Sequence, residues 1–208
     1  MEKVHNFMGN AIYHFNDEFM LNTNEIKTIQ KLKVNEAYAF NKEDCKFFIS
    51  DDKKILNDDN LKRLKEYFHL KINKYINDVL CIKSEVQLTN SWYTINKKGG
   101  KHHDHRHRNA FVSLVYYPKI SGGGILFSDV DPLITLKMNM DFHVIKENEF
   151  NCNSIEFKPT NNDGIIFPGW VTHESLPNDS DEDRIMIGAN YWVKGEYGTK
   201  NQVNQVKI

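Results

Sequence analysis

The sequence lacks a long apolar run. None of its stretches approaches the roughly 18 consecutive apolar residues that a membrane-spanning helix needs. The opening residues, MEKVHNFMGNAIYHFNDEF, contain no unbroken apolar segment of the kind found in a secretory signal peptide. These absences argue against a membrane-spanning or secreted protein, and we expect a cytoplasmic one.

Cysteine is scarce. Cys45, Cys81 and Cys152 are odd in number and widely spaced, which excludes a disulfide framework and a Cys-x-x-Cys zinc pair. Free cysteine is among the most buried residue types, so we expect three structural thiols.

The chain also lacks an excess of charge of either sign. Its 27 basic and 28 acidic side chains leave a net charge of −1 at pH 7. This balance gives no sign of a nucleic-acid footprint over the whole protein, and any anion-binding site must be local. With 208 residues, of which 40% are hydrophobic, the chain can bury a substantial core as a single domain, residues 1–208.

Two helices are predicted in the first third. Thr23 or Asn24 can cap a segment that runs to about Leu32. A stronger signal occupies residues 61–80, where apolar side chains recur every three or four positions. We therefore expect residues 1–83 to form a helix-rich support for the rest of the chain.

From residue 84 the apolar period shortens to two. Val86, Leu88 and Trp92 alternate with polar residues, which is typical of a strand. Further short runs, separated by turn-forming residues, occupy 111–120, 124–129, 134–138, 141–145, 154–159, 164–170 and 184–193. Seven or eight such strands after a helical lead-in favour a mostly β fold with N-terminal helices, a jelly-roll or sandwich rather than a parallel α/β sheet.

Four histidines lie within nine residues, KHHDHRHRN, at positions 101–109. Such a run is either a solvated loop or a metal site, because histidine is the commonest metal ligand among side chains. Side chains two residues apart on a strand share a face, so His105 and His107 can converge on one ion. The best candidate for a third ligand is His173, at the end of GIIFPGWVTH. Three protein ligands leave coordination positions open, as catalysis requires.

Arg184 opens the predicted strand RIMIGANYWV, in which alternation puts Arg184, Met186, Gly188 and Asn190 on one face. An arginine at such a place is ordinarily an exposed rim residue. If its face lines the interior of a barrel, it needs an anion, and a carboxylate bound through two hydrogen bonds is the natural one.

Three segments together resemble the iron(II)- and 2-oxoglutarate-dependent oxygenases, in particular the prolyl-hydroxylase-like branch and its phage-type members. They are GGKHHDHRH, VSLVYYPKISGGGILFSD and GIIFPGWVTHESLPNDSDEDRIMIGANYWV, all within residues 91–193. Four features occur in the family's order: a glycine six residues before the first histidine, a hydrophobic strand ending in Gly-Gly, a distal histidine after Phe-Pro, and a following basic residue.

The resemblance implies a double-stranded β-helix, a cupin-like jelly-roll, over residues 84–196. It further implies that His105 and His173 bind Fe(II) and that Arg184 binds the distal carboxylate of the co-substrate 2-oxoglutarate. The implied reaction is hydroxylation of a substrate by O2, with release of succinate and CO2, and in it metal and co-substrate supply the chemistry that the protein positions.

Three further residues stand at positions that recur in the family. His102 lies where prolyl hydroxylases carry a tyrosine that contacts the co-substrate, and it can donate the same hydrogen bond. Tyr117 and Asn190 match other recurring positions and are expected near the co-substrate, although Tyr117 equally fits a core aromatic.

The sequence departs from the family pattern at one ligand. The superfamily has His-x-Asp/Glu, whereas the glycine spacing here puts His107 at the carboxylate position, as in phage-type members. A literal His-x-Asp also exists, at His102 and Asp104. We favour the register of His105 and His107, with Asp104 as an acceptor that orients a ligand imidazole.

No feature of the sequence selects a peptide, a nucleotide or a small metabolite as the primary substrate. A basic rim could steer an anion or could simply be solvated, and it consists of Lys97, Lys98, Lys101, Arg106 and Arg108. Trp92 and Trp170 could stack on a ring or could pack at strand edges.

Two other classes of function fit the histidines. A zinc site with three histidines activates water for hydration or hydrolysis, but such a site has no evident need of Arg184. A jelly-roll binding or structural module with incidental histidines would bind no metal tightly and would not be stabilised by 2-oxoglutarate.

Overall fold

The computed structural model describes residues 2–7, 9–36, 46–128, 145–146 and 154–208. The predicted strand at 134–138, nearly all of the one at 141–145, and two of the cysteines, Cys45 and Cys152, lie outside these ranges.

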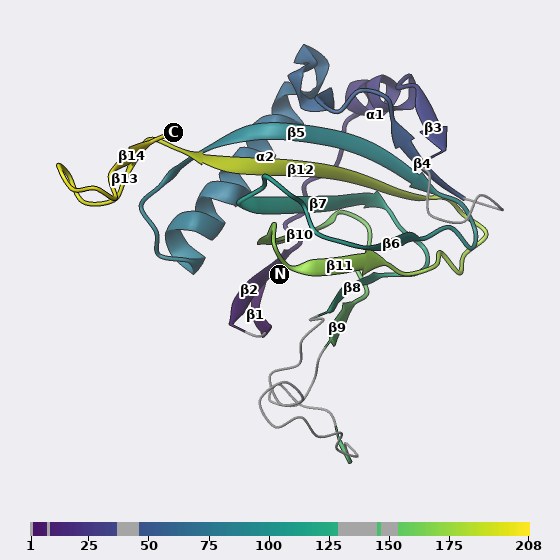
Figure 1. Cartoon of the computed structure of the whole chain (residues 1–208). Coiled ribbons are helices and arrows are strands. Elements are labelled where there is room, and N and C mark those ends of the chain that lie inside the picture. Colours follow the sequence, from purple (N-terminus) through teal and green to yellow (C-terminus); the bar gives the residue numbers. More distant parts are fainter. Residues whose placement is uncertain (1, 8, 37–45, 129–144, 147–153) are drawn as a thin grey trace.

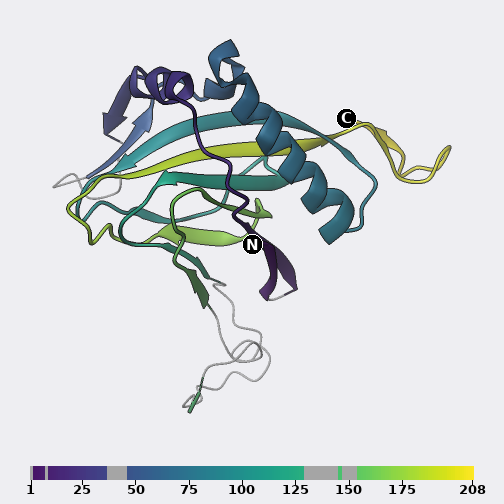
Figure 2. The same cartoon turned by 180° about the vertical axis from the view of Figure 1, so that it is seen from behind.

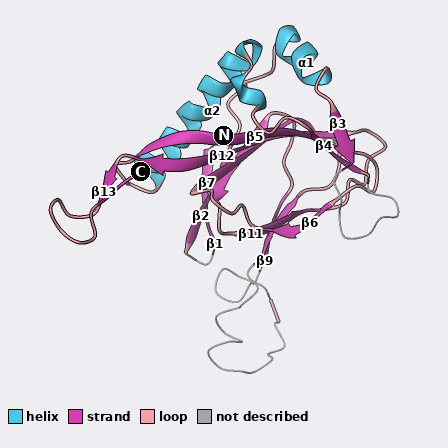
Figure 3. Cartoon of the chain, turned by 45° about the horizontal axis from the view of Figure 1, so that its top comes forward, coloured by secondary structure: helices cyan, strands magenta, loops and turns pink. Residues whose placement is uncertain are grey.

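Two antiparallel sheets face each other, and helices cover the outer face of the larger one (Figure 1; Figure 3). The large sheet has the order β1 (Glu2–Phe7), β2 (Asn10–Phe15), β10 (Asp163–Pro168), β7 (Val112–Lys119), β12 (Arg184–Lys194), β5 (Glu85–Asn96), β4 (Phe47–Ser50) and β3 (Val34–Glu36). The small sheet has the order β6 (His102–His105), β11 (Thr172–Ser175), β8 (Ile125–Ser128) and β9 (Ser154–Phe157). A hairpin of β13 (Glu196–Tyr197) and β14 (Val206–Lys207) extends from the end of β12. The expected mostly β fold is confirmed.

The large sheet separates two hydrophobic cores, and β7 shows how one strand serves both. Leu114 and Tyr116 point to the core beneath the helices, while Val115 and Tyr117 point to the core between the sheets. Both faces of β7 are therefore buried, which explains why the strand reads as a continuous apolar run rather than an alternation.

The helices form as predicted in place and type. Helix α2 (Lys62–Lys74) follows the 3-10 turns η1 (Ile55–Asn57) and η2 (Asp59–Leu61) and continues into a π-helical turn, η3 (Tyr75–Val79). Its stripe of Leu64, Phe68 and Ile72 is fully buried against the large sheet (Figure 2). Helix α1 (Thr23–Gln30) is capped by Asn22, one residue before the expected candidates.

The prediction for the first third of the chain named only helices and missed four strands. β1 and β2 extend the large sheet beyond β10, and β3 and β4 extend it beyond β5. Alternation over only three to six residues carried too little signal to outweigh the helices. Residues 1–83 thus contribute to the sheet as well as to its cover.

A β-bulge in β5 overturns one detail of the predicted alternation. Asn190 pairs with Asn90 and Tyr191 pairs with Leu88, so Thr89 is an extra residue in the ladder. The bulge reverses the parity of the strand. Leu88 therefore faces the helices, whereas Trp92 faces the space between the sheets.

The expectation of buried thiols is wrong for Cys81. This residue is exposed, with a positive φ of 53°, at the end of the π-helical turn. Among the described residues, no helix is both long and apolar enough to cross a membrane.

A charged cluster ties the N-terminal strand to α2. The Lys71 side chain is 5% exposed, and its Nζ lies 3.1 Å from Glu2 and 2.6 Å from Asp17. Hydrogen bonding, first from Lys74 and then from Lys71, lowers the pKa of Glu2 to about 2. Burial raises the pKa of Asp17, but hydrogen bonds from Lys71 and Tyr67 outweigh it and leave that pKa lowered.

This cluster predicts a loss of stability in acid. Because the folded-state pKa values are lowered, the stabilisation is complete above the unfolded-state values of about 4 and is lost as the pH falls below them. Both carboxylates are more than a third exposed, so we expect a decrease of no more than about 1 kcal/mol between pH 6 and pH 3 from this cluster. Guanidinium unfolding of wild type and of a Glu2→Gln, Asp17→Asn double variant measures it. An equal acid-induced decrease in both proteins would contradict the assignment.

Candidate active site

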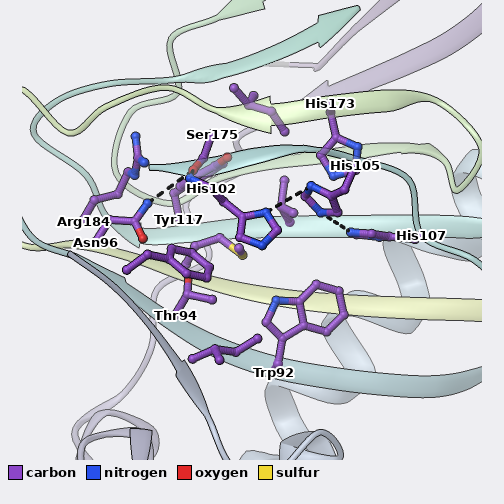
Figure 4. A pocket seen from close by; sticks show the side chains of 15 residues that line it. Trp92, Thr94, Asn96, His102, His105, His107, Tyr117, His173, Ser175 and Arg184 are labelled. Carbon is purple, nitrogen blue, oxygen red and sulfur yellow. Dashed lines mark hydrogen bonds between the residues drawn. The ribbon is translucent and has the colours of Figure 1, made fainter. Parts of the chain in front are cut away.

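A cavity of about 210 Å³ lies between the two sheets (Figure 4). Its walls come from β4, β5, β7 and β12 of the large sheet and from β6, β8 and β11 of the small one. Among the residues predicted for the site, it is lined by His102, His105, His107, Tyr117, His173 and Arg184. Side chains that are 79 residues apart in sequence, from His105 to Arg184, thus share one enclosed space.

A second bulge, in β6, brings His102 and His105 to the same side. His105 pairs with His173 and His102 pairs with Ser175, so three steps on β6 match two on β11. Strict alternation would point these histidines to opposite faces, and the extra residue corrects the parity. As a result, both rings face the cavity, with their Nδ1 atoms 3.1 Å apart.

Three imidazoles converge at one end of the cavity. The Nε2 atoms of His105 and His107 are 3.2 Å apart, and one ligand atom of each of His105, His107 and His173 lies within 4.8 Å of the others. His107 lies two residues beyond the end of β6, so the expected pair spans a strand end and the loop after it. The three predicted histidines therefore come together.

Each of these imidazoles is held from behind through Nδ1. His105 Nδ1 is 2.9 Å from the His103 carbonyl, and His173 Nδ1 is 3.0 Å from the Val171 carbonyl. A carbonyl can only accept, so both rings carry hydrogen on Nδ1 and present a lone pair on Nε2. The predicted acceptor, Asp104, is exposed, and backbone carbonyls take its place.

His107 is held by a chain of two side chains instead. Its Nδ1 is 2.6 Å from Ser113 Oγ, and the Ser113 hydroxyl donates to Asn190 Oδ1 at 2.9 Å. Because the hydroxyl hydrogen goes to Asn190, the hydrogen in the first bond comes from His107, whose Nε2 lone pair is free. Asn190 thus lies behind His107 and does not line the cavity.

Burial keeps these rings neutral. It is the largest cause that lowers the pKa of His107 to about 4 and that of His102 to about 3, and the neighbouring imidazoles lower both values further. Burial likewise lowers the pKa of His105, and it lowers that of His173 well below the usual value. At neutral pH the cluster therefore offers lone pairs to a cation.

Arg184 lies at the other end of the cavity and is 2% exposed. It donates to the carbonyls of Leu176 at 2.8 Å and Gly122 at 3.4 Å. In the amide orientation that satisfies both side chains, the Asn96 oxygen also accepts from its Nε at 3.2 Å. In the part of the chain that the structure describes, no carboxylate lies within ion-pair distance of this guanidinium, although the charge of Asp179 favours its protonated form.

A glycine loop makes room for Arg184. A Cβ added at Gly123 would lie 2.2 Å from Arg184 Nη1 and 2.6 Å from the Pro177 carbonyl oxygen, and the residue has a φ of +73°. A Cβ at Gly122 would meet Asp179 Oδ1 at 2.2 Å. The turn SGGG therefore fixes the guanidinium by close approach of backbone, which only glycine permits.

Trp92 forms the wall beside the histidines. Its ring centroid lies 5.3 Å from that of His107, nearly perpendicular, and it packs on Gly188 of the neighbouring strand. Trp170, by contrast, is 52% exposed and does not line the cavity. Of the two tryptophans, Trp92 is the one that contacts the candidate site.

Several lining residues were not predicted. Asn96 lies opposite Arg184 in the β5–β12 ladder, and Phe47 and Ile49 reach the cavity from β4. Ser113, which lies behind His107 rather than in the cavity wall, could have been found from the sequence, since it shares the inward face of β7 with Tyr117. The others depend on which strands become neighbours, and nothing local in the sequence reveals that.

The residues present fit a divalent transition metal and an anion. The three neutral imidazoles donate hydrogen bonds through Nδ1 and leave Nε2 free to bind a metal. Such a set suits iron, zinc, nickel or copper and leaves coordination positions open toward the cavity. The guanidinium in the same cavity, which has no ion-pair partner among the described residues, suits a carboxylate.

The comparisons with known proteins point to one family. A family model described as "Putative 2OG-Fe(II) oxygenase" matches residues 90–190. No curated protein sequence matches the chain.

Solved structures share the fold at low identity. The non-heme, α-ketoglutarate-dependent epimerase SnoN of nogalamycin biosynthesis is 12% identical, with a TM-score of 0.61 over 93% of this chain and 83% of its own. A Trichoplax adhaerens prolyl hydroxylase, in complex with a hypoxia inducible factor peptide, is 14% identical, with a TM-score of 0.57 over 87% and 83%. HygX from Streptomyces hygroscopicus, with nickel and 2-oxoglutarate bound, is 8% identical, with a TM-score of 0.53 over 86% and 82%. The expected double-stranded β-helix is confirmed.

The hydrogen bond behind His107 predicts the effect of Ser113→Ala. Removing the hydroxyl frees the His107 ring to turn away, so we expect the affinity for Co(II) to fall roughly tenfold to a hundredfold. Ser175→Ala removes a hydroxyl that lines the cavity and accepts from the His102 backbone amide rather than from one of the three clustered rings, and it should leave the affinity unchanged. Equal losses in both variants, measured by absorbance titration, would contradict this role.

Proposed function

The chain belongs to the 2OG-Fe(II) oxygenases, and on that premise we propose that it hydroxylates its substrate with O2, converting 2-oxoglutarate to succinate and CO2. The observation that carries the proposal is the pairing, in one cavity, of three converging imidazoles with a buried guanidinium that has no carboxylate partner among the described residues. A dicarboxylate that reaches from one to the other satisfies both.

In this proposal His105, His107 and His173 bind Fe(II). The register of His102 and Asp104 is less favourable, because the Asp104 side chain is exposed and lies outside the cluster of potential ligands. The Nδ1 hydrogen bonds orient the three rings so that the ligand atoms need little rearrangement when the metal binds.

Arg184 binds the distal carboxylate of 2-oxoglutarate. Asn96 and the Leu176 carbonyl hold the guanidinium in place. Tyr117 lies beside it, fully buried, where burial raises the pKa of the hydroxyl to about 12, so Tyr117 remains a neutral hydrogen-bond donor toward the co-substrate. His102 lies between the two ends of the cavity and contacts the middle of the co-substrate.

The bound metal and co-substrate supply the oxidising chemistry, and the protein supplies position and exclusion of water. Apolar side chains from both sheets close the cavity, including Ile49, Val115, Ile125 and Met186. Asn190, through Ser113, keeps His107 in the orientation that binding requires. Trp92 faces the space left for the primary substrate.

The first 83 residues act as a support that also completes the cavity. Their helices cover the face of the large sheet remote from the site (Figure 3). Strand β4 contributes Phe47 and Ile49 to the cavity wall. Residues 84–196 carry all the proposed ligands, within one domain of residues 1–208.

The proposal is tested by anaerobic titration of the apo-protein with Fe(II) and then 2-oxoglutarate. We expect a visible charge-transfer absorption that requires both, because only chelation of the metal by the keto acid produces it. Arg184→Met should weaken co-substrate binding at least tenfold, since it removes a buried charged hydrogen bond. His173→Ala should abolish the absorption. Tight zinc binding with no response to 2-oxoglutarate would instead favour a water-activating zinc enzyme, and no tight metal would favour a binding module.

The close packing of Gly123 on Arg184 predicts that a side chain at this position weakens only the binding of the co-substrate. Gly123→Ala must displace Arg184 or the 176–177 backbone, so we expect the Kd for 2-oxoglutarate to rise roughly tenfold while metal affinity stays unchanged. Gly9→Ala is the matched control, because Gly9 also has a positive φ but has no neighbour within 4 Å of an added Cβ. A loss of metal binding in the Gly123 variant would contradict the prediction.

A further inference from the structure

A groove lies on the helix-covered face of the large sheet, between α1 and the strands β5, β7 and β12. It has a volume of about 700 Å³ and shares no lining residue with the cavity that contains the histidines. The sheet separates the two spaces, because Ile95 and Ile185 line the groove while their sequence neighbours Asn96 and Arg184 line the cavity. The groove is therefore a separate hollow of ligand size, since small-molecule sites typically measure about 300–1,000 Å³.

The lining of the groove is mainly apolar, and part of it is open to solvent. Ile29 of α1 is 3% exposed, but Ile26 on the same helix is 42% exposed and Met20, just before the helix, is 63% exposed. Pro118 and Ile185 close the side formed by the sheet. Large apolar side chains that stay exposed together around a hollow mark a binding surface more often than isolated ones do. An apolar body is thus what the groove accommodates.

Tyr93 places a polar group within this apolar lining. Its side chain is 5% exposed, and its hydroxyl makes no hydrogen bond to any residue that the structure describes. Burial, and then the charge of Asp183, raise the pKa of Tyr93 to about 12, so the hydroxyl stays neutral and can donate. A buried hydroxyl without a partner is costly, and a ligand in the groove can remove that cost.

Asp183 gives the groove its charge. Each other acidic residue of the run 179–183 has a partner: Asp179 accepts from the Gly123 amide, Asp181 is 2.7 Å from Lys98, and Glu182 is 3.0 Å from Lys119. Asp183 has no ion-pair partner among the described residues, and it lines the groove together with Lys119, which Glu182 neutralises. The groove therefore offers one uncompensated negative charge.

We propose that this groove is a second ligand site, for a small molecule with an apolar body and a positively charged amine or guanidinium at one end. The body packs between Ile26 and Ile185, the cationic end lies beside the Asp183 carboxylate, and a polar atom of the ligand accepts from or donates to the Tyr93 hydroxyl. The site is independent of the proposed function, because it lies on the other face of the sheet from the histidines and Arg184.

The test uses 3-phenylpropylammonium as the probe and 3-phenylpropanol as its neutral analogue. Both are titrated at pH 7 into the full chain labelled with ¹³C at the methionine methyl groups. Met20 lines the groove and Met186 lines the cavity, so the two NMR signals report the two spaces separately. The Met20→Leu variant assigns the first signal.

We expect both probes to shift the Met20 signal, with dissociation constants on the order of 1 mM for ligands of this size. The amine should bind roughly threefold to fivefold more tightly than the alcohol, as a partly exposed ion pair provides. Asp183→Asn should remove this preference. Asp181→Asn is the matched control, because Asp181 belongs to the same acidic run but does not line the groove, and it should leave the preference at its wild-type value. Tyr93→Phe should weaken both probes by roughly twofold to tenfold.

Three results would overturn the inference. One is equal affinity for amine and alcohol in the wild-type protein, and another is a probe that shifts Met186 and leaves Met20 unchanged. The third is a Met20 signal that moves with protein concentration in the absence of any probe, because a second copy of the chain would then cover the groove.

Discussion

The hydrogen bonds made by the three histidines through Nδ1 are the constraint on which the site depends. They fix which nitrogen carries the proton, and thus leave three lone pairs aimed at one point. Two of the acceptors are backbone carbonyls, which cannot adopt another role. The third is a serine hydroxyl held by Asn190 on a neighbouring strand. The cluster is therefore organised by the sheets themselves before any ligand arrives.

The two bulges set the direction of the key side chains. In a regular ladder, His102 and His105 would face opposite ways, and Trp92 would share the face of Leu88. The extra residues in β6 and β5 reverse the parity at the right places, so that all three aromatic rings enter the cavity. Bulges often lie next to functional sites for this reason: they direct a side chain at the cost of one unpaired residue.

Sequence reasoning was most reliable where a pattern was long or chemically specific. The run of apolar residues along α2 and the strands β7, β8, β9, β10 and β12 followed from period and spacing. The convergence of His105, His107 and His173 followed from the strand face shared by His105 and His107 together with the family resemblance. The four N-terminal strands were missed because their alternation is short. Asn96 was missed for another reason: its role arises from a strand neighbour, and strand order is a tertiary property. Asp104 was expected to orient an imidazole, but backbone carbonyls accept those hydrogen bonds instead.

Gly188 gives the cavity a feature that a single substitution would alter. Its missing side chain lets the Trp92 ring lie flat on β12, because an added Cβ would fall 2.3 Å from a ring atom. The neighbouring positions Ile187 and Ala189 belong to the core on the other face and are held by its packing. A side chain at position 188 would therefore displace the Trp92 ring and change the shape of the cavity wall beside His107.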